Sequence, residues 1–157
     1  MSITAKPAPD RRVKAFLCHA SEDKPVVKEL YRKLQEDGFE PWLDQRALHA
    51  GELWERKIFE AIRSSDAFLV CLSQSSPVTE GFVNREIAYA LEIVKNKPED
   101  AIFIIPIRLD HKVQLPTHLS QWQSPEFFTA RGYQEIVSSL RRRAEQLGAS
   151  DTPPVVL

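Results

Sequence analysis

The feature that most limits the fold of this chain is the run AFLVCL at residues 67–72, which carries no polar side chain. A strand with one face in water would alternate apolar and polar residues, so a continuously apolar strand is buried on both faces. Such strands occupy the centre of parallel sheets, which helices cover on both sides. The run therefore predicts an α/β protein.

Four further segments have the length and composition of strands, and amphipathic segments with helical periodicity separate them. In chain order, the five expected strands are residues 13–18, 39–43, 67–72, 101–107 and 126–128. Strands that alternate with helices through right-handed crossovers form a doubly wound parallel sheet. Pro41 lacks a backbone N–H, which favours a sheet edge for the second strand. We therefore expect five parallel strands in the order 2-1-3-4-5, with helices on both faces.

The 157 residues suffice for one domain with tails. Residues 1–11 are polar and Pro-rich, and we expect a disordered lead. The domain itself is expected over residues 12–148, with Gly38 ending its first helix and Gly148 its last. Residues 149–157 are expected to form a tail or a linker to a further domain.

Composition argues against several classes of partner. The formal net charge of −1 gives no overall attraction to nucleic acid or to a membrane surface. No signal peptide is recognisable, and no stretch approaches the ~20 apolar residues of a membrane span. Cys18 and Cys71 lie in apolar runs and are expected to be buried free thiols. These features predict a cytoplasmic protein.

One carboxylate occupies an unusual position in the helix expected from about Glu80. At 100° per residue, Glu86 falls inside the apolar arc, close to Phe82 and Tyr89. A carboxylate there is paired, neutralised or kept for chemistry, and structural ion pairs are the commonest case. This helix follows the third strand, and ligands of doubly wound sheets bind beyond the carboxyl ends of strands one and three. Glu86 is thus a candidate functional residue.

Several other site types do not fit the sequence. Neither a P-loop nor a Gly-x-Gly-x-x-Gly turn is present, and the four histidines lack metal-ligand spacing, so no metal is expected. A phosphoryl-accepting receiver domain would need an aspartate at the end of the third strand. Cys71, Leu72 and Ser73 stand there, so the receiver hypothesis fails.

Five short blocks, in matching order and spacing, resemble the signatures of Toll/interleukin-1 receptor (TIR) domains of the bacterial kind. They are FLCHASED (16–23), GFEPWLD (38–44), LHAGELW (48–54), FLVCLS (68–73) and VNREI (83–87). The resemblance covers roughly residues 12–147 and implies a flavodoxin-like fold. It also implies that residues 44–51 form the "BB loop", through which such domains associate with one another.

The resemblance implies an activity as well. Many bacterial and plant relatives cleave NAD+ between nicotinamide and ribose with a glutamate on the helix after strand three, and Glu86 matches that residue. The positions that match the family's substrate contacts are His19, Ala20, Ser21, His49, Leu53, Trp54 and Phe82. Phe82 replaces a tryptophan found in many relatives, and Ala20 and Ser21 replace a pair of arginines. Trp54 is equally well read as a buried anchor.

These expectations combine into one functional prediction with two alternatives. The chain is predicted to be an NAD+ glycohydrolase that self-assembly activates, in bacterial defence signalling. NAD+ is its substrate and no cofactor is expected. The product can be plain or cyclised ADP-ribose. The alternatives are a non-catalytic TIR–TIR adaptor and an effector that mimics host adaptors.

Overall fold

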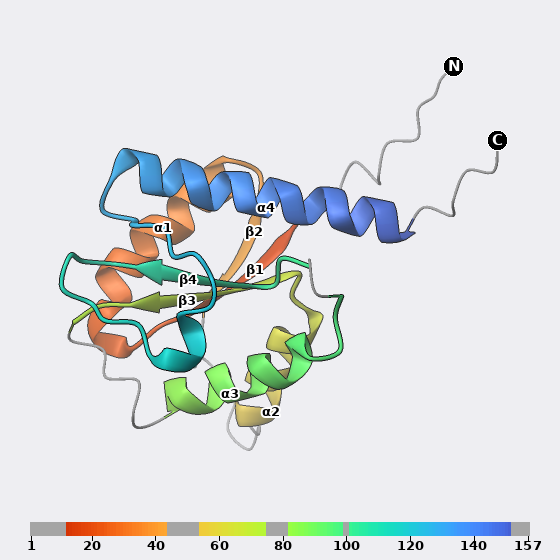
Figure 1. Cartoon of the computed structure of the whole chain (residues 1–157), viewed down its shortest axis with the longest axis horizontal. Coiled ribbons are helices and arrows are strands. Elements are labelled where there is room, and N and C mark those ends of the chain that lie inside the picture. The colour runs from red at the N-terminus through yellow and green to blue at the C-terminus, as the bar shows by residue number, and fades with distance from the viewer. Residues whose placement is uncertain (1–11, 44–53, 75–81, 99–100, 152–157) are drawn as a thin grey trace.

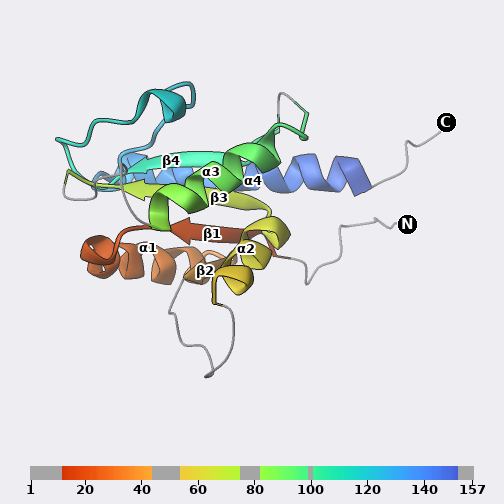
Figure 2. The ribbon, with the colours of Figure 1, turned by 90° about the horizontal axis from the view of Figure 1, so that it is seen from below.

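The apolar run forms β3 (Ala67–Leu72), whose six residues are all buried. The computed structural model describes residues 12–43, 54–74, 82–98 and 101–151. In it, β1 (Lys14–Cys18) and β4 (Ile104–Arg108) flank β3 in parallel, and β2 (Glu40–Leu43) pairs in parallel with β1. The sheet order is β2-β1-β3-β4, as Figure 2 shows from bottom to top. The prediction of a parallel sheet with Pro41 at its edge is confirmed.

The expected fifth strand is wrong for the described residues. Where residues 126–128 were expected to form it, a single parallel bridge joins Glu126 to Arg108. Arg108 N donates to Pro125 O at 2.9 Å, and Phe127 N donates to Arg108 O at 2.9 Å. The chain then turns, because Thr129 N bonds Glu126 O and α4 begins at the next residue. The segment takes the place of a fifth strand but is too short to be one.

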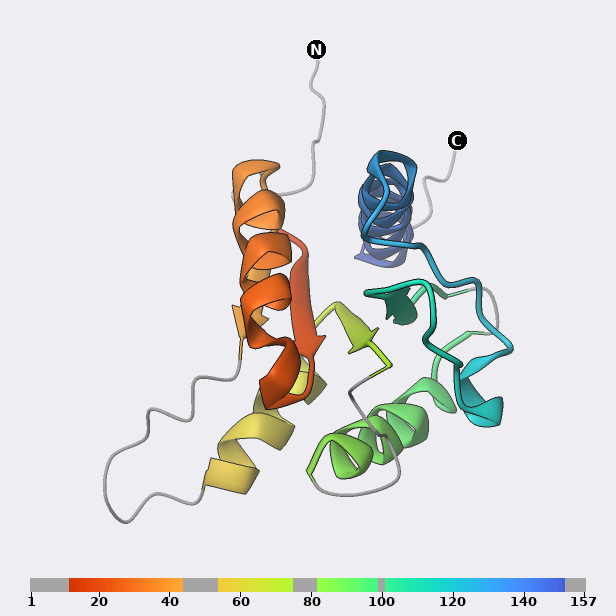
Figure 3. The same ribbon diagram turned by 90° about the vertical axis from the view of Figure 1, so that its left-hand side faces the viewer.

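In the part of the chain that the structure describes, two pairs of helices cover the sheet, which gives three layers. The helices α1 (Lys24–Glu36) and α4 (Ala130–Asp151) lie on one face. On the other face lie α2 (Trp54–Ser64) and α3 (Phe82–Val94), as Figures 1 and 3 show. Because side chains alternate along a strand, Leu17 and Leu69 join the core under α1 and α4, while Phe16 and Phe68 join the core under α2 and α3.

The two glycines expected to end helices behave differently. Gly38 follows α1 with a φ of 93°, a conformation that glycine adopts without strain, and that prediction is confirmed. Gly148 lies inside α4, which continues to Asp151, so the expected stop at Gly148 is wrong. Tertiary contacts hold this part of the helix, since Gln146 Oε1 accepts a 2.8 Å bond from Ile102 N. Figure 1 shows the last turns of α4 extending beyond the sheet.

The structure also bears on the expectations for the two cysteines and for membrane-spanning segments. Cys18 and Cys71 are buried thiols that form no disulfide, as predicted. Within the described segments, no helix combines the length and apolar character that crossing a bilayer requires.

Candidate functional site

Glu86 lies in α3 and is buried, with 3% of its surface exposed. Its neighbours Ile87 and Ala90 belong to the core between α3 and the sheet. The periodicity of the sequence places Glu86 on this side of the helix, and the structure confirms it. The helix start expected at Glu80 lies outside the described residues. Figure 2 shows the first turns of α3 over the carboxyl end of the sheet, the edge where ligands bind in such folds.

The loop after β1 lies at the same edge of the sheet. The ring nitrogen Nδ1 of His19 is 3.1 Å from Leu17 O, which ties the ring to the end of the strand. Asp23 N donates to Ala20 O at 2.9 Å, and this bond closes the 3₁₀ turn Ser21–Asp23. His19 and Ala20 are half-buried and Ser21 is exposed, so these predicted substrate contacts line the edge from the β1 side.

The remaining predicted contacts fall where the structure gives no side chain. His49 and Leu53 lie outside the described residues, as does the 44–51 loop. Trp54 and Phe82 are the first residues of α2 and α3, and their backbones alone are described. Their roles stay predictions.

An aromatic row crosses the sheet beneath α2 and α3. Phe16 stacks on Trp42 at a ring-centroid distance of 5.0 Å and on Phe68 at 5.4 Å, and Phe68 continues the row to Phe103 at 6.5 Å. Phe16 is fully buried, so it belongs to the core. Trp42 ends the row at the sheet edge and is 36% exposed. This row was not predicted from the sequence, although Trp42, Phe16 and Phe68 lie at paired positions of neighbouring strands.

Three polar residues near the carboxyl ends of strands, Asp23, Ser73 and Asp110, were not predicted as site residues. Ser73 Oγ donates a 2.6 Å hydrogen bond to Asp23 Oδ1, and both side chains are buried. On the other side of β3, Asp110 Oδ2 accepts a 2.9 Å bond from Gln74 N. The available signal was their place at the carboxyl ends of β1, β3 and β4, where a polar residue stands close to any ligand.

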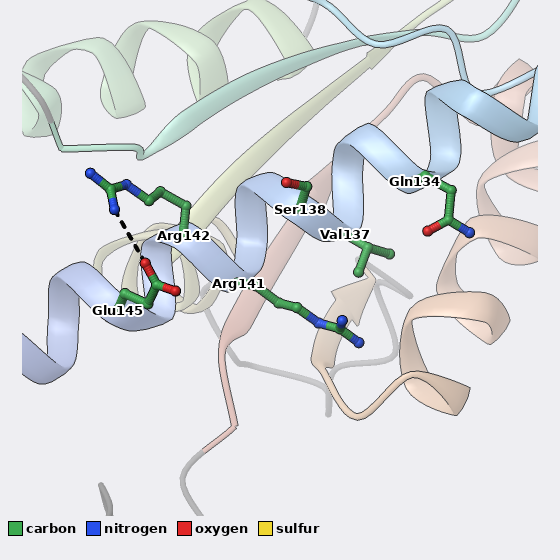
Figure 4. A pocket seen from close by; sticks show the side chains of 6 residues that line it. All are labelled: Gln134, Val137, Ser138, Arg141, Arg142 and Glu145. Atoms are coloured by element: carbon green, nitrogen blue, oxygen red, sulfur yellow. Dashed lines mark hydrogen bonds and ion pairs between the residues drawn. The ribbon is translucent and has the colours of Figure 1, made fainter.

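Described residues also line cavities elsewhere on the molecule. One, of about 300 Å³, runs along α4 (Figure 4), where Arg142 turns toward Glu145 at 3.2 Å; it is lined by Gln134, Val137, Ser138, Arg141, Arg142 and Glu145. Another, of about 410 Å³, borders β2 and α2. Neither lining includes Glu86 or the β1 loop, so neither is the predicted site. Over the described segments, no three His, Cys, Asp or Glu side chains group in a way that could hold a metal ion.

Solved structures share this fold. The TIR domain of the Toll-related receptor TRR-2 from Hydra magnipapillata superposes with a TM-score of 0.63 at 20% identity, covering 81% of this chain and 97% of that one. A metazoan TIR-STING receptor from C. gigas gives a TM-score of 0.62 at 17% identity, covering 88% and 43%. At these identities the similarity concerns the fold.

Sequence relatives match parts of longer proteins. The 2' cyclic ADP-D-ribose synthase BtTIR of Bacteroides thetaiotaomicron is 34% identical over 70 residues, which are 44% of this chain and 24% of the relative. An uncharacterized protein of Sinorhizobium fredii, y4cD, is 29% identical over 103 residues, or 65% and 16%. This chain therefore spans a quarter or less of either relative.

A family model described as TIR domain matches residues 15–140, which include all core residues but Val13, together with the β1 loop and Glu86. The fold and the order of the sequence blocks agree with that match. This chain belongs to the TIR domain family.

Proposed function

We propose that this chain cleaves NAD+ between nicotinamide and ribose and that Glu86 is its catalytic residue. The observation that carries the proposal is a carboxylate with 3% exposure on α3, at the ligand edge of a TIR-family sheet. Burying a carboxylate costs several kcal/mol unless partners offset that cost, so such groups cluster at functional sites. A relative named for synthesis of a cyclic ADP-ribose supports a substrate that contains ADP-ribose.

The chemistry needs only one acid. In NAD+ the pyridinium nitrogen already carries a positive charge, so the bond from ribose C1′ to that nitrogen breaks with its electron pair and nicotinamide leaves neutral. The charge develops on the ribose as an oxocarbenium ion, which a nearby carboxylate stabilises. Water then adds its oxygen to C1′ and releases a proton, giving ADP-ribose. Addition of a hydroxyl from the same molecule would give the cyclised product.

The surroundings of Glu86 favour that role. A buried carboxylate acts in a lower effective dielectric than water, so its attraction to a developing cation exceeds that in water. His19, Ala20 and Ser21 lie at the same edge and are proposed to contact the substrate. His49, Leu53, Trp54 and Phe82 complete the proposed site from residue types and family position.

Activation by self-association through residues 44–51 and a role in bacterial defence signalling belong to the same proposal. One observation favours the second candidate, a non-catalytic assembly module. Trp42 exposes 36% of its surface on the edge strand directly before residues 44–51. Exposed aromatic side chains are enriched at protein interfaces.

Incubation of the concentrated chain with NAD+, with and without a crowding agent, distinguishes the two candidates. The enzyme hypothesis predicts nicotinamide release that falls about a hundredfold or more in Glu86→Gln. Glu92→Gln is the matched control, because Glu92 lies in the same helix but is exposed and pairs with Lys95 at 2.9 Å. Concentration-dependent association without turnover in any variant would favour the assembly module. Equal release by folded Glu86→Gln and the parent would exclude a catalytic role for Glu86.

A further inference from the structure

Ser73 is the first residue after β3, and its hydroxyl reaches across to the loop after β1. Ser73 Oγ donates to Asp23 Oδ1 at 2.6 Å, a short distance typical of a hydroxyl bound to a carboxylate. Asp23 also closes the β1 loop, through the bond from its backbone N–H to Ala20 O at 2.9 Å. One side chain thus joins the exit of β3 to the loop that holds His19, Ala20 and Ser21.

Gln74, the second residue after β3, is bound from the opposite side, by the loop after β4. Gln74 N donates to Asp110 Oδ2 at 2.9 Å, and the other oxygen of Asp110 accepts from Lys112 N at 3.0 Å. Leu109 N donates to Leu72 O at 2.8 Å just before this point. Carboxylates after β1 and β4 therefore fix two consecutive residues that follow β3. We name Asp23, Ser73, Gln74 and Asp110 the β3-exit clamp.

The environment of Asp23 is costly for a carboxylate. Asp23 is 5% exposed, and its second oxygen, Oδ2, is buried without a hydrogen-bond donor among the described residues. Burial, and second the negative charge of Asp23, raise the pKa of Cys71 in β3. An underbonded buried oxygen lowers stability, and an apolar pair of similar shape is often neutral or stabilising in its place. Stability alone therefore does not explain the arrangement.

The place of the β3-exit clamp in the chain, between β3 and α3, does explain the arrangement. Seven residues, 75–81, connect the β3-exit clamp to α3, and Glu86 lies in the second turn of that helix. The direction in which the chain leaves β3 therefore affects the position of the start of α3. With it changes the position of Glu86 relative to the β1 loop. A misplacement of ~1 Å in a catalytic group can cost about a hundredfold in rate. The clamp joins the two sides between which the proposed reaction occurs.

We propose that Asp23 and Asp110 are positioning residues, which act through Ser73 and the backbone of Gln74 to hold the β3 exit and thereby set the place of Glu86 against the β1 loop. The inference rests on the proposed function for its kinetic consequence and on the geometry alone for its structural one. Neither aspartate is proposed to contact the substrate.

The test compares two hydroxyl deletions. Ser73→Ala removes a hydroxyl that donates to an aspartate at 2.6 Å, and Tyr133→Phe removes another with the same distance to Asp37, in a bond that joins α1 and α4. The whole chain is used for both. Two quantities are measured: kcat and KM for nicotinamide release, and hydrogen–deuterium exchange of the α3 backbone around Glu86, each set beside the melting temperature.

Ser73→Ala is expected to lower kcat by about tenfold or more with KM changed by less than about threefold, and to speed exchange in α3. Tyr133→Phe is expected to leave both within about twofold at a comparable loss of melting temperature. Ser73→Thr restores the hydroxyl and is expected to recover the rate. Equal effects of Ser73→Ala and Tyr133→Phe on kcat and on α3 exchange would overturn the inference.

Exchange separates this inference from the proposed function. If the parent chain releases no nicotinamide, the proposed function is contradicted, and exchange in α3 still decides the structural claim. Faster α3 exchange in Ser73→Ala than in Tyr133→Phe would then support the clamp, and equal exchange would contradict it.

Discussion

The Tyr133 hydroxyl donates a 2.6 Å hydrogen bond to Asp37 Oδ2, joining the residue that follows α1 to the first turn of α4. The two residues are 96 positions apart in the chain. Tyr133 belongs to the core beneath these helices, and the Lys33 ammonium lies 5.2 Å from its ring centroid. The bond therefore couples the first and last helices on the face opposite Glu86.

This bond predicts a loss of stability at alkaline pH. Burial, then the hydrogen bond to Asp37 and the charges of Asp37 and Glu36, raise the pKa of Tyr133 above its ordinary value of 10.0, while Arg141 opposes them. The folded chain thus keeps the proton to a higher pH than the unfolded chain. The contribution is complete below about pH 10 and is lost as pH rises toward the folded pKa.

Urea unfolding of the parent and of Tyr133→Phe at a series of pH values from 8 upward, on the order of half a unit apart, measures this effect. The difference in the free energy of unfolding between the two is expected to shrink above about pH 10. A difference that is constant or grows with pH would contradict the assignment.

Two glycines of α4 are predicted to respond to alanine in opposite directions. A Cβ on Gly132 would lie 1.7 Å from the Glu126 carbonyl oxygen, so Gly132→Ala must push the helix away from the bridge segment. Such overpacking against backbone is expected to cost about 1–3 kcal/mol or more. A Cβ on Gly148 meets nothing within 4 Å, and Gly148→Ala is expected to add about 0.5–1 kcal/mol through helix propensity. Thermal unfolding of both variants measures the signs, and destabilisation by Gly148→Ala would contradict the account of α4.

Two neighbouring arginines are also predicted to differ. Arg143 is 6% exposed and donates from Nε to Asp66 O at 2.7 Å, so Arg143→Ala removes a buried hydrogen bond and the packing of a long side chain. We expect a loss of about 2–4 kcal/mol. Arg142 is exposed and pairs with Glu145, so Arg142→Ala is expected to change stability by less than about 0.5 kcal/mol. Chemical denaturation measures both, and similar losses would show that Arg143 does not anchor α4.

Part of this architecture is readable from the sequence because local patterns determine it. The unbroken apolar run of β3 indicates burial on both faces, and Pro41 favours the sheet edge for β2. The helical period alone places Glu86 on the buried side of α3, which the structure confirms. The proposed catalytic role of Glu86 concerns the charge that develops on the ribose, and burial alone does not test that role.

The errors have a common cause, which is long-range contact. Residues 126–128 have strand composition, but α4 begins too soon for more than one bridge to form. Gly148 looks like a helix stop, but contacts such as that of Gln146 with Ile102 continue the helix past it. The partnership of Ser73 with Asp23 spans 50 residues, and no local periodicity predicts which polar groups will meet.

The most direct test of the central claim separates binding from cleavage in Glu86→Gln. NAD+ binding by equilibrium dialysis and nicotinamide release by chromatography are measured on the same concentrated samples of parent, Glu86→Gln and Glu92→Gln. We predict binding within about threefold for all three chains and release that falls about a hundredfold or more in Glu86→Gln alone. Release by Glu86→Gln at the parent rate, with the fold intact, would contradict the claim that this buried carboxylate meets the charge that develops on the ribose.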